Sequence, residues 1–479
     1  MRKPFRSLTA LMFLTAFAPF VHSQDNSALL DLLVRKKIIS AKDADNVRSQ
    51  LDQQQSSRAA NQLKLSDSLT KLTFGGDLRL RYQYDRTDVQ AGPAPGQTNY
   101  ENALQRSRWR YRLRLNATFE LGPSIFGGFS LATGHASDSN NQTFDNGFAN
   151  SSIYINRAYL GWKAADWLTI TAGKQDNVFY STDLVWDNAD VHPAGLVEVI
   201  RFDKLFAPKE ETPAGLAKDG KAAAEKQATE PPWTLALNLG QYYYSDNSES
   251  TTDSDSKTDA GIFGAQLQGS YRFGSVTATF APAAYFYNAA SLTGFDNNVS
   301  FQDSATVSGA TRKLTVLAAP GDLAFKVMGI PAKFYWDFAW NPQGKGRAND
   351  IYRTFDVLPN GTVRFNHSTG DDLAWLAGFL AGQNKKAGDL SLNFNFRRTG
   401  IASIDPNLND PNFALGYLNT QGFKAGVQYN LTESLTFGVT YYYAWNLHKN
   451  LVEGEATGDQ KIANANTVQV LQADLMLKF

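Results

Sequence analysis

The chain has 479 residues, of which none is cysteine and 60 are aromatic (31 Phe, 20 Tyr and 9 Trp). Without cysteine it has no disulfide framework, no thiolate nucleophile and no cysteine-based metal site. The 46 basic and 46 acidic side chains cancel, and without the three basic residues of the predicted leader the balance is 43 minus 46, a net charge of −3, which gives no indication of nucleic-acid binding.

Residues 1–23 predict a signal peptide. Basic side chains open this segment, an apolar stretch follows at residues 8–20, and residues 21–23 offer a cleavage site. The apolar stretch is too short for a membrane-spanning helix, which needs about 20 apolar residues. We therefore expect an exported protein whose mature chain starts near Gln24.

Residues 24–69 predict a short periplasmic helical segment followed by a polar linker. The apolar side chains of this segment fall at helical spacings, at Leu29, Leu32, Leu33, Val47 and Leu51. Ser40-Ala41-Lys42-Asp43 resembles a capping box that opens a second helix. The pattern fits a self-associating coiled coil and an isolated amphipathic spacer equally well.

Residues 106–120 carry an alternating pattern that predicts a membrane-spanning strand. Successive side chains of a strand point to opposite faces. One face carries five arginines and then polar residues, at Arg106, Arg108, Arg110, Arg112, Arg114, Asn116, Thr118 and Glu120. The other face carries Trp109, Tyr111, Leu113, Leu115, Ala117 and Phe119. Because unpaired guanidiniums cannot be buried in a soluble core, we expect the apolar face to contact lipid and the basic face a water-filled lumen.

The same alternation recurs from Lys71 to the end of the chain, beginning with a strand in which Leu78, Leu80 and Tyr82 alternate with Arg79 and Arg81. An edge strand of a soluble sandwich with a basic outer face would explain one such segment but not the recurrence. The predicted fold class is therefore all-β, a transmembrane antiparallel β-barrel over residues 70–479.

The connections between the predicted strands alternate in length, as in outer-membrane barrels with short periplasmic turns and long extracellular loops. Short turns are expected at 122–124, 164–166, 274–275, 330–332 and 431–434, and long loops near 86–103, 136–152, 176–195, 244–259, 288–320, 342–370, 399–412 and 447–462. This gives about 16 strands. The long connection at residues 206–232 falls on the periplasmic side and is either an insertion or a miscounted strand pair.

The last strand ends at the aromatic residue Phe479, with apolar residues at alternate positions before it. This ending resembles the recognition signal by which outer-membrane barrels are assembled. It predicts that the C-terminal strand binds the barrel-assembly machinery.

Inward-facing cations outnumber inward-facing acids on the predicted strands. They include Arg79, Arg81, Arg106, Arg108, Arg110, Arg112, Arg114 and Arg157. Charged rings set the sign of the ion that a pore prefers, and arginine is well matched to carboxylate and phosphate. The pattern predicts an anion-attracting lumen; the alternative is that each arginine is paired with a loop acid and only supports the structure.

The third extracellular loop, residues 176–195, has an unusual apolar content for a solvent-facing loop. Its acids Asp183, Asp187 and Asp190 stand beside Phe179 and Trp186. If the loop folds into the barrel, its aromatic side chains would pack on the wall and its acids would face the arginines. We therefore expect a constriction with a transverse electric field.

Several of these segments resemble the putative porin family of Gram-negative outer membranes. They are Gly173-Lys174-Gln175, Thr182 to Asp187 with Pro193 and Gly195, the leucine-rich helical start, and Asn419-Thr420-Gln421-Gly422-Phe423. The resemblance implies a passive diffusion pore for small hydrophilic solutes in the outer membrane, commonly a homotrimer, with no cofactor. The 206–232 insertion departs from the family pattern.

An enzyme is the rival from another class, but the four histidines after the leader, His135, His192, His367 and His448, suggest neither a Ser-His-acid grouping nor a metal site. A substrate-specific channel for a sugar or a phosphate-type solute is a closer alternative, since Tyr242, Tyr243, Tyr244, Trp336 and Trp340 could stack sugars. Interfacial aromatic belts explain most of these aromatic residues as well. A plugged barrel acting as an adhesin or a structural protein is the remaining alternative.

Overall fold

A computed structural model describes the parts of the chain from which the following architecture is taken. These are residues 35–36, 46–47, 68–90, 101–134, 140–144, 150–187, 189–206, 231–245, 260–288, 314–360, 363–367, 372–448, 451–453 and 465–479. The predicted signal peptide, nearly all of the predicted helical segment and the core of the 206–232 connection lie outside these residues.

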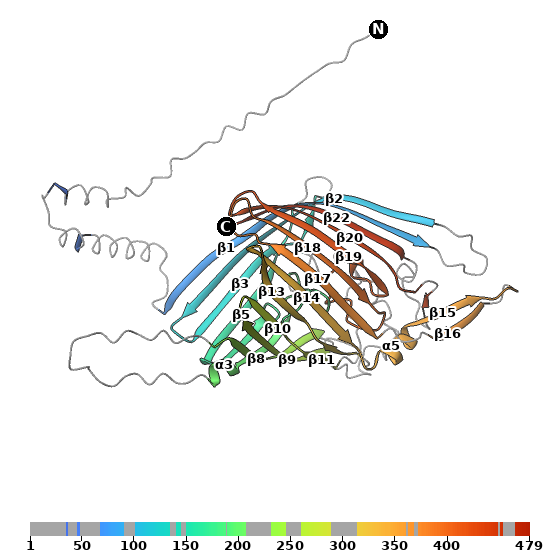
Figure 1. Cartoon of the computed structure of the whole chain (residues 1–479), viewed down its shortest axis with the longest axis horizontal. Helices are drawn as coiled ribbons and strands as arrows, with labels where there is room; N and C mark the ends of the chain where they lie inside the picture. The colour runs from blue at the N-terminus through green and yellow to red at the C-terminus, as the bar shows by residue number, and fades with distance from the viewer. Residues whose placement is uncertain are drawn as a thin grey trace, which may run out of the picture. The chain divides into compact units, whose positions relative to one another are not determined.

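The described part of residues 70–479 forms a closed antiparallel barrel of 16 strands, which confirms the predicted fold class (Figure 1). The first strand, β1 (Leu69–Gln90), pairs with the last, β22 (Ala465–Lys478), and so closes the sheet. Between them lie β2 (Glu101–Leu121), β3 (Ile125–Thr133), β4 (Gln142–Thr143), β5 (Ile153–Ala165), β6 (Leu168–Lys174), β7 (Ala194–Arg201), β8 (Trp233–Ser245), β9 (Ala260–Phe273), β10 (Val276–Phe280), β11 (Ala283–Tyr287), β12 (Thr315–Ala318), β13 (Gly321–Val327), β14 (Ile330–Trp340), β17 (Leu373–Gly382), β18 (Leu390–Thr399), β19 (Thr420–Asn430) and β20 (Leu435–Asn446).

The sheet contains 19 segments because three of its strands are interrupted. β9 pairs with both β10 and β11, β14 pairs with both β12 and β13, and β2 pairs with both β3 and β4. Two of the breaks contain Pro282 and Pro320, which lack the N–H that a continuous ladder requires. Nineteen segments minus three interruptions give the 16 strands.

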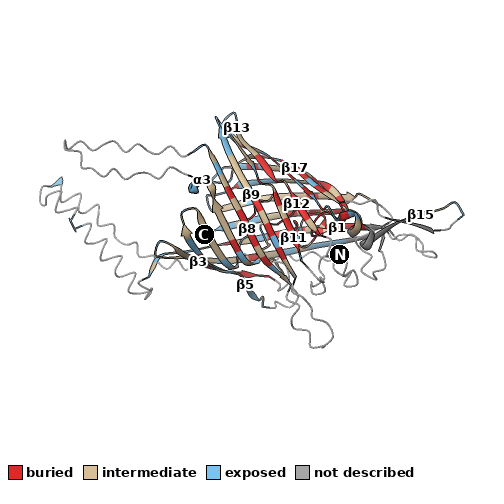
Figure 2. Cartoon of the chain, turned by 90° about the horizontal axis from the view of Figure 1, so that it is seen from below, coloured by how far each residue is buried: buried red, intermediate tan, exposed pale blue. Residues whose placement is uncertain are grey.

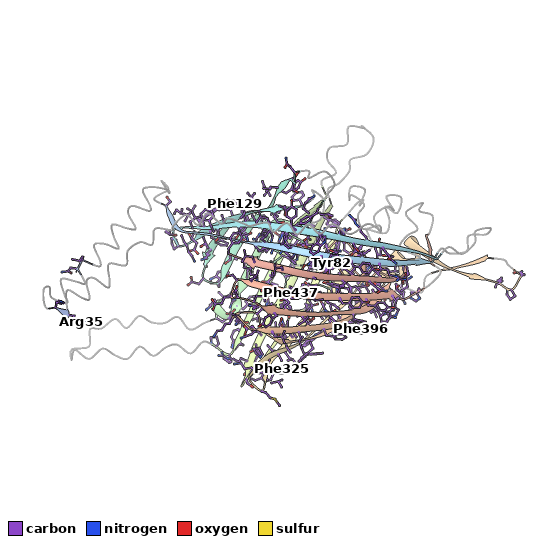
Figure 3. All side chains as sticks on the ribbon, turned by 90° about the horizontal axis from the view of Figure 1, so that it is seen from above. Arg35, Tyr82, Phe129, Phe325, Phe396 and Phe437 are labelled. Atoms are coloured by element: carbon purple, nitrogen blue, oxygen red, sulfur yellow. The ribbon has the colours of Figure 1, made fainter. Side chains whose placement is uncertain are left out.

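The two faces of the wall differ chemically as the alternation predicts. Leu80, Trp109 and Leu115 are 42%, 58% and 42% exposed, whereas Arg81 and Arg112 on the other face are buried. Figure 2 shows buried and exposed positions alternating along the strands, and Figure 3 draws outer-face aromatic side chains such as Phe129, Phe396 and Phe437. An apolar exterior and a polar interior are the arrangement that a barrel in lipid requires.

The two ends of the barrel chain meet at Gly76 and Phe479. The Gly76 N–H donates to the Phe479 carbonyl at 2.8 Å, and the Phe479 N–H donates to the Gly76 carbonyl at 3.1 Å. A Cβ atom at Gly76 would lie 2.9 Å from the Phe479 ring, so glycine leaves the space that the terminal ring occupies.

Most of the predicted turns coincide with hairpin turns of the barrel, but the one predicted at 330–332 is wrong. That turn lies at Met328 and Gly329, whose φ angles are +51° and +83°, and Pro331 is the second residue of β14. Proline is common in turns but is also tolerated near the start of a strand, where Pro331 lies. The tight connection at residues 383–389 and the strand β12 inside the predicted 288–320 loop were not expected.

The strands on either side of the 206–232 connection, β7 and β8, pair directly with each other in the 16-stranded barrel, and residues 207–230 of the connection lie outside the described residues. The short helix α3 (Phe202–Leu205) directly precedes this connection. A second, three-stranded sheet joins two other loops, with β15 (Tyr352–Val357) paired to β16 (Val363–His367) and β21 (Leu451–Glu453). The remaining helical elements are α5 (Gly344–Ile351) and the 3₁₀ turn η2 (Ala414–Gly416).

Candidate functional site: a constriction made by two loops

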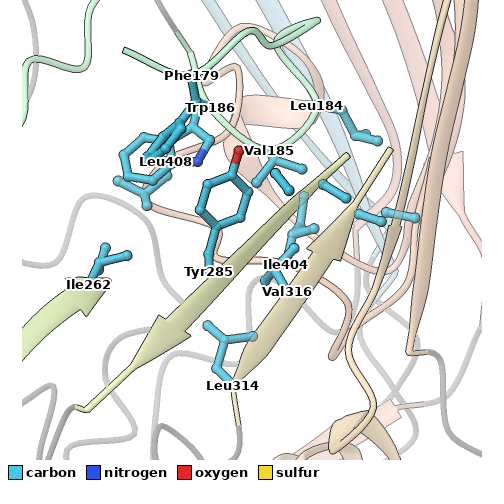
Figure 4. Close-up of a cluster of buried hydrophobic side chains, with 14 of the residues drawn as sticks. Phe179, Leu184, Val185, Trp186, Ile262, Tyr285, Leu314, Val316, Ile404 and Leu408 are labelled. Carbon is cyan, nitrogen blue, oxygen red and sulfur yellow. The ribbon is translucent and has the colours of Figure 1, made fainter. Parts of the chain in front are cut away.

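Loop three, which we define as residues 175–193 between β6 and β7, packs against the inner wall. Its side chains Phe179, Leu184 and Trp186 are at most 2% exposed. The Phe179 ring lies 5.0 Å from the ring of Tyr285 on β11, and the Trp186 ring lies 5.6 Å from it (Figure 4). Burial of these rings removes a large apolar area from the water of the lumen. The apolar half of loop three therefore holds the loop inside the barrel.

Two wall glycines make room for Phe179. A Cβ atom at Gly264 on β9 would lie 2.3 Å from the Phe179 ring, and one at Gly240 on β8 would lie 3.0 Å from it. Any larger residue at Gly264 would displace the ring. The absence of side chains at Gly240 and Gly264 therefore leaves the space in the wall that the Phe179 ring of loop three fills.

Polar groups of loop three are satisfied by the same wall. The Gln266 side chain accepts a hydrogen bond from the Tyr180 N–H at 2.7 Å and donates to the Tyr180 carbonyl at 2.9 Å. The Tyr180 hydroxyl donates to Asp322, and the Thr182 hydroxyl donates to Asp337 at 3.0 Å. Buried polar groups need such partners, so these contacts fix the position of the loop along the wall.

Loop seven, which we define as residues 400–419 between β18 and β19, also folds inward. Its apolar side chains Ile401, Ile404, Leu408 and Phe413 are all at most 7% exposed. Ile404 and Leu408 belong to the cluster that contains Trp186. The sequence predicted only a polar extracellular loop at 399–412, although the regular return of apolar residues between its Asp, Asn and Pro residues could have indicated burial.

The two loops are hydrogen-bonded to each other through their backbones. The Asp187 N–H donates to the Leu408 carbonyl at 2.6 Å, and the Asp410 N–H donates to the Asp183 carbonyl at 3.3 Å. Asp183 has a φ of +67°, a left-handed conformation that aspartate tolerates better than most residues. Loops three and seven therefore form one continuous obstruction rather than two separate ones.

The wall residue Arg397 on β18 joins the same assembly. Its guanidinium donates to the Asp183 carbonyl at 3.3 Å and to the Asp410 carboxylate at 3.4 Å. The same group lies over the Phe413 ring, 4.5 Å from the ring centroid. A single buried arginine thus contacts both loops.

Burial and nearby charges shift the pKa values of two aspartates in the loops, Asp187 and Asp410. Burial, followed by the neighbouring carboxylates of Asp410, Asp190 and Asp183, raises the pKa of Asp187 to about 8. Burial also opposes ionisation of Asp410, but Lys424 and Arg397 outweigh it and hold the pKa of Asp410 below its usual value. The constriction therefore contains one carboxylate that titrates above neutral pH beside one that stays ionised.

Half of the eight arginines predicted to line the lumen are paired with strand acids. Arg81 binds both oxygens of Asp474, each at 2.7 Å, and Arg108 binds Asp85 at 2.8 Å. Arg112 and Arg114 share the carboxylate of Asp77, at 2.8 and 2.7 Å. The loop-three acid Asp190 lies 3.6 Å from Arg112, and Asp176 pairs with Arg157.

Arg79 and Arg110 contact amide groups. Arg79 donates to the side-chain carbonyl of Asn141, and Arg110 donates to the Gln83 side chain at 3.1 Å and to the Asn141 backbone carbonyl at 3.2 Å. Arg106 is exposed further along β2. The wall formed by β22, β1 and β2 thus contains guanidiniums beyond those that its carboxylates neutralise.

A cavity of about 350 Å³ is lined by residues of both loops and of β1, β17, β18, β19, β20 and β22. Its charged lining consists of Arg79, Arg81, Lys424, Asp183, Asp187, Asp410 and Asp474. Of the other predicted constriction residues, Trp186 is buried at 1% exposure in the apolar cluster. The sugar-stacking candidates lie elsewhere: Tyr242 is buried beneath loop three, and Trp340 is 39% exposed on the outer face.

Within the described residues, no group of three or more His, Cys, Asp or Glu side chains could hold a metal ion. In the same part of the chain, no helix has the length and apolar character needed to cross a membrane.

Three solved structures are similar to the chain. Pseudomonas putida OprB at high pH shares 10% identity at a TM-score of 0.46, covering 85% of this chain and 94% of that one. Salmonella typhi OmpF in complex with daunomycin shares 11% identity at a TM-score of 0.41, covering 87% and 99%. A mutant of the Rh. blastica porin shares 10% at a TM-score of 0.38, covering 85% and 100%.

No curated protein sequence matches the chain. The model of one protein family, described as "Putative porin", matches residues 44–330, which is more than half of the chain. Together with the closed barrel, this match shows that the chain belongs to that family and is an outer-membrane porin of a Gram-negative bacterium.

Proposed function

We propose that small hydrophilic solutes diffuse passively through the lumen, past the constriction of loops three and seven, and that anions pass more readily than cations. The observation that carries the anion preference is the surplus of arginine on one wall. Seven arginines there (Arg79, Arg81, Arg106, Arg108, Arg110, Arg112 and Arg114) stand against the strand carboxylates Asp77, Asp85 and Asp474 and the loop-three carboxylate Asp190, a difference of +3 for these residues, and Glu120 further along β2 is paired with Lys71.

The opposite side of the constriction is weakly acidic. Asp183, Asp187 and Asp410 face Arg397 and Lys424, a difference of −1 when all are ionised. The net charge of −1 on the loops does not cancel the net charge of +3 on the arginine wall. The opposite signs of the two charges create an electric field across the pore. The sum favours anions while keeping the pore permeable to both signs.

Single-channel conductance in planar bilayers, followed by the reversal potential across a salt gradient, tests this function. Stable conductance steps with an anion-favouring reversal potential are expected. Steps with a cation preference would leave the pore standing and refute the selectivity. No steps from correctly folded protein would favour a plugged barrel acting as an adhesin or structural protein.

We propose a channel rather than an enzyme, which the family and the fold support.

We also propose that the protein forms a homotrimer, which the resemblance to porins supports. In addition, we propose that the barrel-assembly machinery recognises the strand that ends at Phe479. Mass measurement of the detergent-solubilised protein tests the first of these. Deletion of Phe479 tests the second, because unassembled chains should accumulate in the periplasm.

A further inference from the structure

We propose that the cavity below the two loops is a binding site for zwitterionic solutes, small molecules that carry an ammonium group and a carboxylate some distance apart, as amino acids and short peptides do. This inference rests on the proposed diffusion function and names a solute class for it. It follows from which charges around the cavity already have partners and which do not.

The cavity has one cation available for a carboxylate. Arg81 is held by both oxygens of Asp474, and Lys424 lies 3.9 Å from Asp410. Arg79 donates to the amide of Asn141, and its buried Nε atom has no acceptor. Among the residues that the structure describes, no carboxylate lies within 4.0 Å of Arg79. A guanidinium in this position can bind a solute carboxylate with two parallel hydrogen bonds.

The two loops contribute carboxylates to the lining of the same cavity that are available for an ammonium group. In the described part of the chain, no Lys, Arg or His nitrogen lies within 4.0 Å of the carboxylates of Asp183 or Asp187, whereas Asp410 has both Arg397 and Lys424. Asp187 is 4% exposed, and its side chain accepts one backbone hydrogen bond, from Ala189 at 3.0 Å. Since burial of an uncompensated carboxylate is unfavourable and raises the pKa of Asp187 to about 8, an ammonium group bound beside it would supply the missing charge and stabilise its ionised form.

The rest of the cavity suits a polar solute without rings. Neutral hydrogen-bonding side chains line it, namely Asn384, Ser391, Asn393, Asn412, Gln428, Thr436, Thr440 and Gln472. The aromatic residue in the lining, Tyr442, already lies under the Lys424 ammonium at 5.4 Å. With no open aromatic face in the lining, the cavity lacks the platform on which a sugar ring would stack.

A zwitterion should bind in this cavity more tightly than a solute that carries only one of the two charges. An anion is attracted by Arg79 but repelled by Asp183 and ionised Asp187. A cation is attracted by the two aspartates but repelled by Arg79. A zwitterion of suitable length satisfies both kinds of charge at once. A solute that binds in the lumen also reduces the ion current, which makes occupancy measurable.

The test compares four solutes of similar size: 4-aminobutyrate (both charges), 4-hydroxybutyrate (anion), 4-amino-1-butanol (cation) and 1,4-butanediol (neutral). Each is titrated against the ion current through the full-length protein in planar bilayers, and the half-blocking concentration is recorded. We expect that of 4-aminobutyrate to be about fivefold or more below those of the other three. Equal blocking by 4-hydroxybutyrate and 4-aminobutyrate would overturn the proposal.

Variants assign the two ends of the solute. Arg79→Gln, which can keep the amide contact, should remove the advantage of 4-aminobutyrate over 4-amino-1-butanol. Asp187→Asn, which can keep the contact to Ala189, should remove its advantage over 4-hydroxybutyrate. The matched controls Lys326→Gln and Glu433→Gln change exposed charges away from the cavity and should alter neither ratio. Conductance without solute discrimination would refute this inference alone, whereas absence of conductance would refute the proposed function.

Discussion

The guanidinium of Arg397 lies 4.5 Å from the ring centroid of Phe413, so that a cation of the barrel wall stacks on an aromatic side chain of loop seven. The same guanidinium donates to the carbonyl of Asp183 in loop three. Because the wall strand is rigid, this contact fixes the distance of both loops from β18. We regard Arg397 as the residue that positions the constriction.

Arg397→Lys should therefore widen and loosen the pore. Lysine keeps the charge but lacks the planar fork that reaches Asp183 and Asp410 together, so we expect single-channel conductance to rise by about 1.5-fold or more, with greater open-channel noise. Arg272→Lys, a matched change on β9 at an exposed position, should leave both quantities unchanged. Unaltered conductance and noise in Arg397→Lys would show that the loops are held without it.

Gly264→Val tests the seat of loop three. The new side chain would collide with the Phe179 ring, and overpacking of this kind costs about 1–3 kcal/mol of folding free energy. We expect a lower unfolding temperature in detergent and a larger conductance as loop three leaves the wall. Gly269→Val on the outer face of the same strand is the control, since its Cβ would meet Leu235 at an ordinary 3.5 Å. Equal effects of the two substitutions would argue against a specific seat for Phe179.

Asp187 should make ion selectivity depend on pH. Its pKa is raised, so the carboxyl is neutral below that pKa and becomes a negative charge in the constriction as the pH rises through about 8. We expect the anion preference to be larger at about pH 6 than at about pH 9. Reversal potentials at the two values measure this change, and Asp187→Asn should abolish most of it. A pH response that survives in Asp187→Asn would have to come from another group.

Two pairs of arginine substitutions separate selectivity from stability. Arg79→Gln with Arg110→Gln removes guanidiniums that contact amides and should weaken the anion preference without unfolding the barrel. Arg108→Gln with Arg112→Gln should weaken it as well, but it also takes the arginine partner from the buried Asp85 and one of two from the buried Asp77, which keeps Arg114, so we expect the larger loss of stability in this double variant. Reversal potentials and urea unfolding in detergent measure the two effects. Equal stability of the two double variants would show that the ion pairs contribute little.

The barrel could be predicted from sequence because its physical cause is local. An alternation such as that of Arg110, Tyr111 and Arg112 is visible within one strand, and lipid on one side and water on the other leave few alternatives. The apolar content of loop three was equally visible in Phe179 and Trp186. These features need no knowledge of which strands are neighbours.

The pairing of the arginines could not be predicted in the same way. Asp77 lies 35 residues before Arg112, and Asp474 lies 393 residues after Arg81, so their contacts depend on strand register and barrel closure. Loop seven was missed for a related reason. Its burial depends on contacts such as that between Leu408 and Asp187, which belongs to a loop more than 200 residues earlier.

The hydrogen bonds that join loop three to the distant wall strands β14 and β18 also bear on the order of folding. Thr182 of loop three binds a residue 155 positions along the chain, and the Asp183 carbonyl binds one 214 positions along. Contacts between such distant segments form slowly, because the intervening chain must first be ordered. The narrowing of the pore can therefore be completed only once β14 and β18 are in place, and a partly assembled barrel would be a wider and less selective opening than the finished one.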